Sequence, residues 1–228
     1  MTGTDTGVGK TTVAVALARL CSRRGGVPIP YKPVETGCAP DPEDARRLWD
    51  AARRPIPLAD VCPFPLALPA APAAAAAAAG IRLDVAHLVR HAFEIATRGT
   101  FLIVEGAGGL LVPYAGRDTN ADIASHLRLP VLVVAKTALG TINHVALTLS
   151  ELRQRRLPIA GVLLVRSALD IEPQEATNAQ LIEQVSGVAP LGTLARLADA
   201  QDADRLADAL EQALPSSALA CLLGPSRS

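Results

Sequence analysis

A glycine-rich turn that leads directly into a helical pattern limits most strongly what this chain can fold into. The turn spans residues 3–12 and reads Gly-Thr-Asp-Thr-Gly-Val-Gly-Lys-Thr-Thr. Such a turn exposes several backbone N–H groups, and the dipole of the following helix adds partial positive charge. The lysine reaches the β- and γ-phosphates of a nucleotide, and the next hydroxyl is placed to bind Mg²⁺. We expect a phosphate-binding loop made by Thr6, Gly7, Val8, Gly9, Lys10, Thr11 and Thr12.

The residues ahead of this turn depart from the usual pattern. A phosphate loop normally follows a buried strand, yet only Met1 and Thr2 precede Gly3, and Thr4 stands where the usual motif has its first glycine. We expect either that the sheet does without this strand or that the start of the chain is misassigned, since a Val codon used as a start is written Met.

The rest of the chain alternates strand and helix patterns. Short runs at 101–104, 131–134 and 159–165 are apolar on both faces, as in parallel strands covered by helices. Weaker strands are expected at 27–34 and 188–191. Helical patterns cover 12–24, 84–98, 141–156 (with Thr141 as a possible N-cap) and 202–214, and 73–79 favours a helix turn or two. The pattern predicts one α/β domain over 1–224, with a mostly parallel sheet between helices in three layers, and a frayed tail at 225–228.

Composition excludes several classes of function. Lys plus Arg and Asp plus Glu each number 22, so there is no basic excess for nucleic acid. The four cysteines form no Cys-x-x-Cys pair, which argues against a zinc site or a disulfide framework. No run approaches the ~20 apolar residues of a membrane span, and no secretory signal begins the chain. A cytoplasmic enzyme is expected, with no membrane partner.

Three charged residues outside the loop are candidates for chemistry. Glu105 follows the strand at 101–104, where open α/β sheets place functional groups, and Asp44 begins a predicted helix. Either could instead be an ordinary helix-capping carboxylate. Lys32 ends a predicted strand before Pro33 and is poised to face the same crevice as Lys10, although a solvated surface lysine is the plainer alternative.

Four motifs together resemble the dethiobiotin synthetase family of P-loop proteins. They are the loop at 3–11, Lys-Pro-Val-Glu-Thr-Gly at 32–37, Val-Glu-Gly-Ala-Gly-Gly at 104–109 and Leu-Gly-Thr-Ile-Asn-His at 139–144. Each motif alone occurs in other P-loop proteins, and the four in this order are specific. The resemblance implies a homodimeric, Mg²⁺- and ATP-dependent ligase of biotin biosynthesis. It would use CO₂ to close a cyclic urea on 7,8-diaminopelargonic acid, bound near the subunit interface.

The resemblance also implies roles for individual residues. Lys10 and Lys32 would be catalytic, and Lys32 would also face the substrate nitrogen. Thr11, Asp44 and Glu105 would bind Mg²⁺, which places Glu105 beside the nucleotide as well. The remaining substrate contacts would come from Thr36, Gly108, Gly109, Leu111 and Asn143. For Asn143, a helix-capping role is an equal alternative.

One position departs from the family, and one other class of protein competes. Val165 stands where the family usually has an asparagine that recognises adenine, so we expect relaxed nucleotide preference.

The competing class is the partition or division-site P-loop ATPase, a nucleotide-driven switch. Those proteins carry a second lysine five residues ahead of the loop lysine, and here that position is Asp5.

Overall fold

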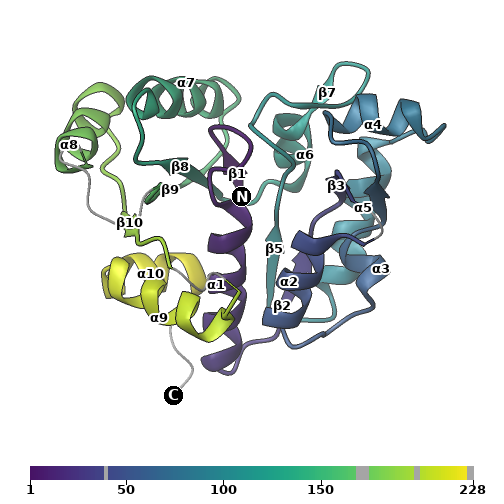
Figure 1. The fold of residues 1–228 in the computed structure, drawn as a ribbon, viewed down its shortest axis with the longest axis horizontal. Helices are drawn as coiled ribbons and strands as arrows, with labels where there is room; N and C mark the ends of the chain where they lie inside the picture. The colour runs from purple at the N-terminus through teal and green to yellow at the C-terminus, as the bar shows by residue number, and fades with distance from the viewer. Residues whose placement is uncertain (39–40, 168–174, 198–200, 225–228) are drawn as a thin grey trace.

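Parallel strands form the centre of the molecule in the computed structural model, which describes residues 1–38, 41–167, 175–197 and 201–224 (Figure 1). One sheet has the order β1-β8-β9-β10, and a parallel pair β2-β5 lies beside it. Their bounds are β1 Thr2–Gly3, β2 Pro28–Tyr31, β5 Phe101–Val104, β8 Val131–Lys136, β9 Ile159–Val165 and β10 Gly192–Leu194. The predicted α/β class with a parallel sheet is confirmed.

Met1 joins the two groups of strands. Its amino group donates to the carbonyl oxygen of Val104 at 2.6 Å, and its own carbonyl accepts from the Gly106 N–H at 3.1 Å. On the other side, Thr2 and Gly3 pair with Val133 and Val134 of β8. The expectation that the sheet lacks a strand before the loop was therefore wrong in part, because a two-residue strand is present and pairs with β8 at the end of the four-stranded sheet.

Helices cover both faces of this sheet. They are α1 Lys10–Arg23, α2 Glu43–Ala51, α3 Leu58–Val61, α4 Pro72–Ala78, α5 Val85–Ala96, α6 Asn120–Leu127, α7 Thr141–Gln154, α8 Glu175–Ser186, α9 Ala203–Ala213 and α10 Ser216–Leu223. Two short pairs lie outside the main sheet, β3 Val34–Thr36 with β4 Phe64–Leu66, and β6 Pro113–Ala115 with β7 Asp118–Thr119.

Alternating side chains of β8 show the layering. Leu132 and Val134 pack into the cluster formed with α1, α9 and α10, whereas Val131 and Val133 pack against α6, α7 and α8. Successive side chains of a strand point to opposite faces, so a strand apolar at every position needs cover on both sides. The result is a three-layer arrangement with the phosphate loop at the carboxyl end of β1.

Several boundaries differ from the sequence predictions. The strand expected at 27–34 is broken after Tyr31, because Lys32 turns away to donate its N–H to Val61 and Pro33 has no donor. The strand expected at 188–191 lies at 192–194, and Gly140, not Thr141, is the N-cap of α7. A further helix, α10, follows the predicted last one. The tail expected at 225–228 lies outside the described residues.

Among the helices described, none combines the length and the apolar character that crossing a membrane requires.

Candidate active site at the carboxyl edge of the sheet

The loop between β1 and α1 has the backbone shape of an anion-binding turn. Gly7 and Gly9 adopt φ values of +67° and +99°, a region that side chains strongly disfavour. Within the described residues, no side chain caps the first N–H groups of α1, which begins at Lys10. These uncapped donors at a helix N-terminus are a suitable site for phosphate.

Lys10 lies against the same loop and is buried. Its Nζ donates to the backbone carbonyl of Asp5 at 2.9 Å. Burial lowers the pKa of Lys10 to about 8, although Glu105 partly opposes the shift. A bound anion would compensate the buried charge and restore the pKa. The role of Lys10 as a phosphate ligand stays a prediction.

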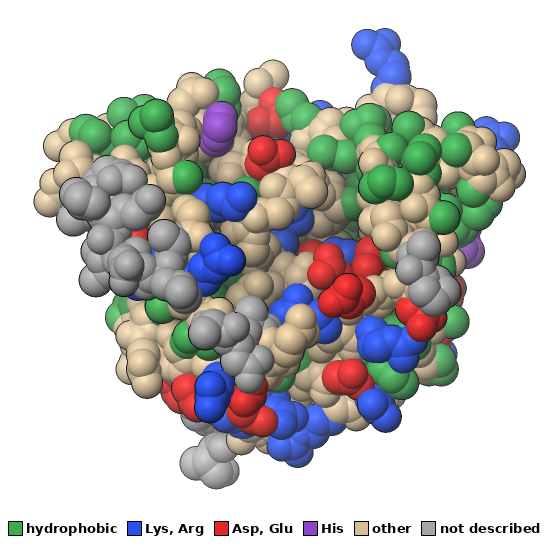
Figure 2. Space-filling model, in the orientation of Figure 1, with side chains coloured by type: hydrophobic (Ala, Val, Ile, Leu, Met, Phe, Trp, Pro, Cys, Tyr) green, Lys and Arg blue, Asp and Glu red, His purple; other side chains and the backbone are tan. Residues whose placement is uncertain are grey.

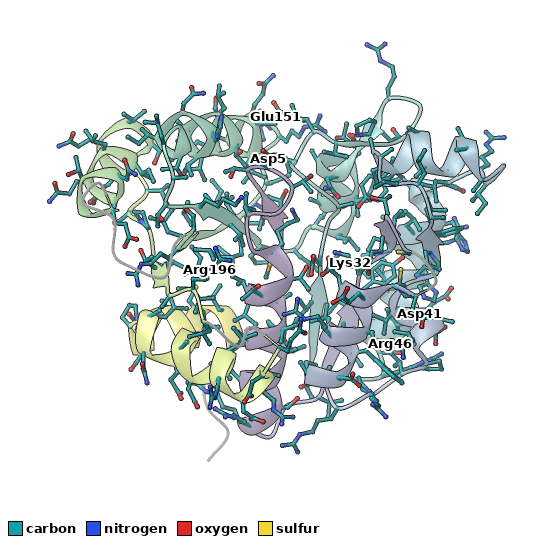
Figure 3. The ribbon with its side chains drawn as sticks, in the orientation of Figure 1. Asp5, Lys32, Asp41, Arg46, Glu151 and Arg196 are labelled. Carbon is teal, nitrogen blue, oxygen red and sulfur yellow. The ribbon has the colours of Figure 1, made fainter. Side chains whose placement is uncertain are left out.

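Lys32 is buried beside the loop and is held by two carboxylates. Its Nζ lies 2.5 Å from Oε1 of Glu105 and 3.2 Å from Oδ2 of Asp44. Lys32 is labelled in Figure 3. Burial favours loss of its proton, but the two carboxylates outweigh burial and raise the pKa of Lys32 above its ordinary value. The two carboxylates therefore favour the ammonium form of Lys32, and the alternative of a solvated surface lysine was wrong because the side chain is buried.

Thr11 completes this cluster from the first turn of α1. Its hydroxyl donates to Oε1 of Glu105 at 2.8 Å. Burial alone would raise the pKa of Asp44, but Lys32 and the Thr11 hydroxyl lower it, so Asp44 is ionised. Four predicted site residues from α1, α2 and the ends of β2 and β5 are thus brought together. Figure 2 shows acidic and basic side chains gathered near the centre of this face.

The donor set in this cluster fits Mg²⁺. It offers two carboxylates and a hydroxyl, the hard oxygen ligands that Mg²⁺ takes together with phosphate oxygens and water. The second oxygen of Glu105, Oε2, is buried and has no hydrogen-bond partner among the residues that the structure describes. Since a buried carboxylate oxygen without a partner is costly, a cation ligated there would satisfy it.

Glu35 fixes Asp44, and sequence reasoning did not single it out. Its carboxylate accepts from the backbone N–H groups of Asp44 at 3.0 Å and Ala45 at 2.8 Å, so it caps α2 from a neighbouring strand. Burial raises the pKa of Glu35, and the two N–H donors partly offset it. The sequence feature that could have identified Glu35 was its position in the Lys-Pro-Val-Glu-Thr-Gly motif.

Asn120 and Tyr114 shape the glycine turn after Glu105, and no sequence motif pointed to either residue. The Asn120 amide donates to the carbonyls of Ala107 and Gly109 at 2.8 and 2.9 Å, and the Tyr114 hydroxyl accepts from the Ala107 N–H at 2.9 Å. A Cβ at Gly106 would lie 2.5 Å from the Asn120 side chain, so this position requires glycine. The turn consequently lies close against the phosphate loop.

The other predicted residues lie around this centre. Gly108 lies close to Thr6, since a Cβ at Gly108 would be 3.3 Å from Oγ1 of Thr6. Gly109 lies against the backbone of Gly3 and Thr4. Thr36 ends β3 and is half-buried. Leu111 and Asn143 are exposed, and no contact described within the chain joins them to Lys32.

Val165 ends β9 against the phosphate loop. A Cβ at Gly9 would lie 2.9 Å from one Val165 methyl group, so the valine packs on the loop backbone. A hydrocarbon side chain at this position offers no hydrogen bond to a base.

A parallel sheet whose glycine-rich loop leads into α1 beside buried lysines defines the P-loop class of nucleotide-binding proteins. The model of a family described as "AAA domain" matches residues 1–204. Two solved structures share the fold: the MinC:MinD cell division complex of Aquifex aeolicus (TM-score 0.59, 13% identity, 100% of this chain and 95% of that one) and a ParA family ATPase of Chlorobium tepidum TLS (0.53, 14%, 98% and 95%).

Curated relatives narrow this class to one family. The chain is 47% identical to the ATP-dependent dethiobiotin synthetase BioD of Anaeromyxobacter dehalogenans strain 2CP-C, over 85% of this chain and 87% of the relative. It is 39% identical to the synthetase of the same name from Bacillus thuringiensis, over 85% and 81%. The chain belongs to the ATP-dependent dethiobiotin synthetase family, as its four motifs predicted.

Proposed function

We propose that this chain closes the cyclic urea of dethiobiotin, using 7,8-diaminopelargonic acid, CO₂ and ATP. The observation that carries the proposal is the meeting of Lys10, Thr11, Lys32, Asp44 and Glu105 at one edge of the sheet. Membership of the family supplies the substrate, and the site supplies a matching arrangement of charge.

The reaction accumulates negative charge, which two lysines can balance. One substrate amine adds to CO₂, loses a proton and becomes a carbamate. A carbamate oxygen attacks the γ-phosphorus of ATP, and ADP leaves. The second amine attacks the carbonyl carbon of the resulting anhydride, phosphate leaves, and the ring closes. No protein nucleophile is required, so positioning and electrostatic stabilisation suffice.

Lys10 and Lys32 take different parts in this scheme. Lys10 contacts the phosphates, where their charge raises its depressed pKa. Lys32 keeps its proton throughout, since two carboxylates stabilise its charge. It therefore serves as a fixed positive charge beside the carbamate and the transferring phosphoryl group, and it is not a proton acceptor.

Mg²⁺ would be held by Thr11, Asp44 and Glu105 and would neutralise charge on the phosphate oxygens. Glu35 then acts on the metal site indirectly, by holding Asp44 through the first turn of α2.

A homodimer is the proposed assembly, with α7 near the interface. Leu139, in the turn before α7, is 98% exposed, and Leu147 on α7 is 62% exposed. Figure 2 shows apolar side chains along the upper edge of this face, over α7 and α4. Exposed apolar patches of this kind mark protein contacts. The N-terminal turn of α7, with Asn143, would then face the substrate's carboxylate in the partner subunit.

Mass spectrometry of the reaction tests the proposed activity. The purified chain is incubated with 7,8-diaminopelargonic acid, bicarbonate and Mg-ATP, beside a Lys10→Ala variant and a mixture without bicarbonate. We expect dethiobiotin and ADP in equal amounts from the unmodified chain alone. ATP hydrolysis without dethiobiotin would contradict the proposal and favour a nucleotide-driven switch of the partition type.

Light scattering tests the dimer with a matched pair of variants. Leu147→Asp should give monomers and lose most of the activity. Phe93→Asp, at an apolar residue 51% exposed on α5, should change neither. A monomeric but fully active Leu147→Asp variant would show that the substrate site is complete in one subunit.

A further inference from the structure

The β6–β7 hairpin lies outside the main sheet and supplies two buried polar side chains (Figure 1). Tyr114 stands in the middle of β6, and Asn120 follows β7 directly as the first residue of α6. The two residues are only 1% and 6% exposed. Both side chains end at the glycine turn 106–109, which follows Glu105. The hairpin therefore holds this turn from two positions.

These contacts fix the direction of one backbone N–H group. The Asn120 amide donates to the carbonyl oxygens of Ala107 and Gly109. The Tyr114 hydroxyl accepts from the N–H of Ala107, so the peptide groups on both sides of Ala107 are held. Because a trans peptide group is planar, the N–H of Gly108 points away from the carbonyl of Ala107 and thus away from Asn120.

The N–H of Gly108 is available to a ligand. Gly108 is half-buried and lies against Thr6 of the phosphate loop. Among the hydrogen bonds of the described residues, none uses this N–H as a donor. A backbone donor whose direction is already set can stabilise charge on a transferring phosphoryl group without reorganising during the reaction.

Ordinary structural roles do not account for the two polar groups. A capping box of Thr119 and Asp122 already begins α6, so Asn120 is not needed as a helix cap. The Tyr114 ring packs in an apolar cluster with Ile123, where a phenylalanine ring would pack equally well. Burial raises the pKa of Tyr114 to about 12, so its hydroxyl stays protonated. The contribution that belongs to the hydroxyl alone is the contact with the turn.

We propose that Tyr114 and Asn120 are positioning residues for phosphoryl transfer, and that they hold the Gly108 N–H where it contacts the phosphoryl group leaving ATP. This role rests on the proposed function, in which ATP phosphorylates a carbamate. The N–H acts on charge that develops in the transition state. Loss of its positioning should therefore lower kcat more than it raises the KM for ATP.

A matched pair of tyrosine variants tests the role of the hydroxyl. Tyr31 is also fully buried, and its hydroxyl donates to the carbonyl of Leu88 at 2.9 Å, outside the turn. Tyr114→Phe and Tyr31→Phe should lower the unfolding midpoint by similar amounts, about 3 °C each. Only Tyr114→Phe should lower kcat for synthesis, by about tenfold or more, while the KM for ATP changes by less than about threefold.

Two measurements without diaminopelargonic acid separate this role from the proposed function. Hydrogen exchange of the Ala107 amide should speed up at least about tenfold in Tyr114→Phe and stay unchanged in Tyr31→Phe. The affinity for MgADP with aluminium fluoride, which mimics a transferring phosphoryl group, should fall about tenfold in Tyr114→Phe, whereas the affinity for MgADP alone stays the same. Asn120→Ala, which removes the other two contacts, should lower the first affinity at least as much.

A loss of stability alone would overturn the proposal. If Tyr114→Phe kept its kcat and its affinity for MgADP with aluminium fluoride, as Tyr31→Phe does, the two side chains would be structural only. Should Tyr114→Phe fail to fold, Asn120→Ala decides the question through the same affinity and kcat. A chain that makes no dethiobiotin but shows both expected changes in exchange and affinity would contradict the proposed function and still support the positioning role.

Discussion

Lys32 illustrates at the scale of one residue how burial and charge are balanced in this site. Its side chain is buried, yet two carboxylates keep it ionised. An ion pair of this kind contributes little net stability, but removal of one partner leaves a charge in a medium of low polarity. Stability and catalysis therefore depend on the same contact between Lys32 and its carboxylates. Replacing one partner or both partners separates the effect on stability from the effect on catalysis.

Glu105→Gln should lower the free energy of unfolding by about 3 kcal/mol, because it leaves the Lys32 ammonium with Asp44 alone. Urea denaturation of the ligand-free protein measures this change. The double variant Lys32→Met with Glu105→Gln should recover much of the stability while synthesis stays below detection. A single variant as stable as the unmodified protein would show that the pair is not buried in solution.

Glu35→Ala should raise the Mg²⁺ concentration that gives half-maximal activity, because Asp44 loses the group that holds its helix turn. Loss of the two N–H contacts should also cost about 1 kcal/mol of stability. Glu35→Gln, which keeps an acceptor oxygen, should lie between the two proteins. Destabilisation with an unchanged Mg²⁺ dependence would restrict Glu35 to a capping role.

Val165 leads to a prediction about nucleotide choice. Because this side chain offers no hydrogen bond to a base, GTP or CTP should support synthesis with a kcat/KM within about tenfold of that for ATP. Val165→Asn should restore a preference for ATP. Strong discrimination by the unmodified chain would mean that other residues recognise adenine.

At the scale of elements, charged pairs fasten α1 to α9. Arg19 and Arg23 on α1 both bind Asp204, and Arg23 also reaches Asp208. The hydrogen bond from Arg19 is the main cause that lowers the pKa of Asp204 to about 2. The helix that presents the phosphate loop is thereby tied to the C-terminal part of the fold.

Asp204→Asn should cost no more than about 1 kcal/mol, since Asp204 is about half exposed and solvent screens the pair. A carboxyl group with a lowered pKa contributes stability that is present above its unfolded value of 3.8 and is lost as the pH falls toward 2. Denaturation at low and high salt measures the effect, which should shrink at 1 M salt. A loss several times larger would indicate that Asp204 also fixes the start of α9.

The sequence predicted elements well where one signal determined them. Strands apolar on both faces, such as 159–165, needed no tertiary information, and β9 has those bounds. Boundaries that tertiary hydrogen bonds decide were missed. Lys32 leaves the strand at 27–34 to pair with Val61, and Glu35 caps a helix nine residues away. The members of the charged cluster were predicted from the family resemblance, whereas no sequence motif predicted the hydrogen bonds of Asn120 and Tyr114 to the turn at 107–109.

At the scale of the whole molecule, the buried amino group of Met1 links stability to pH. Burial lowers the pKa of this group from 8.0 to about 6. The unfolded chain therefore binds more protons between these values, and stability should rise as the pH increases from 6 to 8, by at most about 2.7 kcal/mol. Below pH 6 and above pH 8, this group adds no further dependence.

Comparison with an Nα-acetylated chain isolates that effect. Acetylation removes the titrating group, so the difference in unfolding free energy between the two chains should vary between pH 6 and 8 and be constant outside that window. Parallel curves across the whole range would mean that the amino group is solvated in the ligand-free protein.

The central position of Met1 has a practical consequence for handling this protein. An affinity tag placed there would convert the amino group that donates to Val104 into a peptide N–H, so the tag would influence folding yield and measured activity. The same tag after residue 224 follows α10 at the periphery. A purification tag is therefore better placed at the carboxyl end. The activities of two preparations can be compared only when the same residues are fused to Met1 in both.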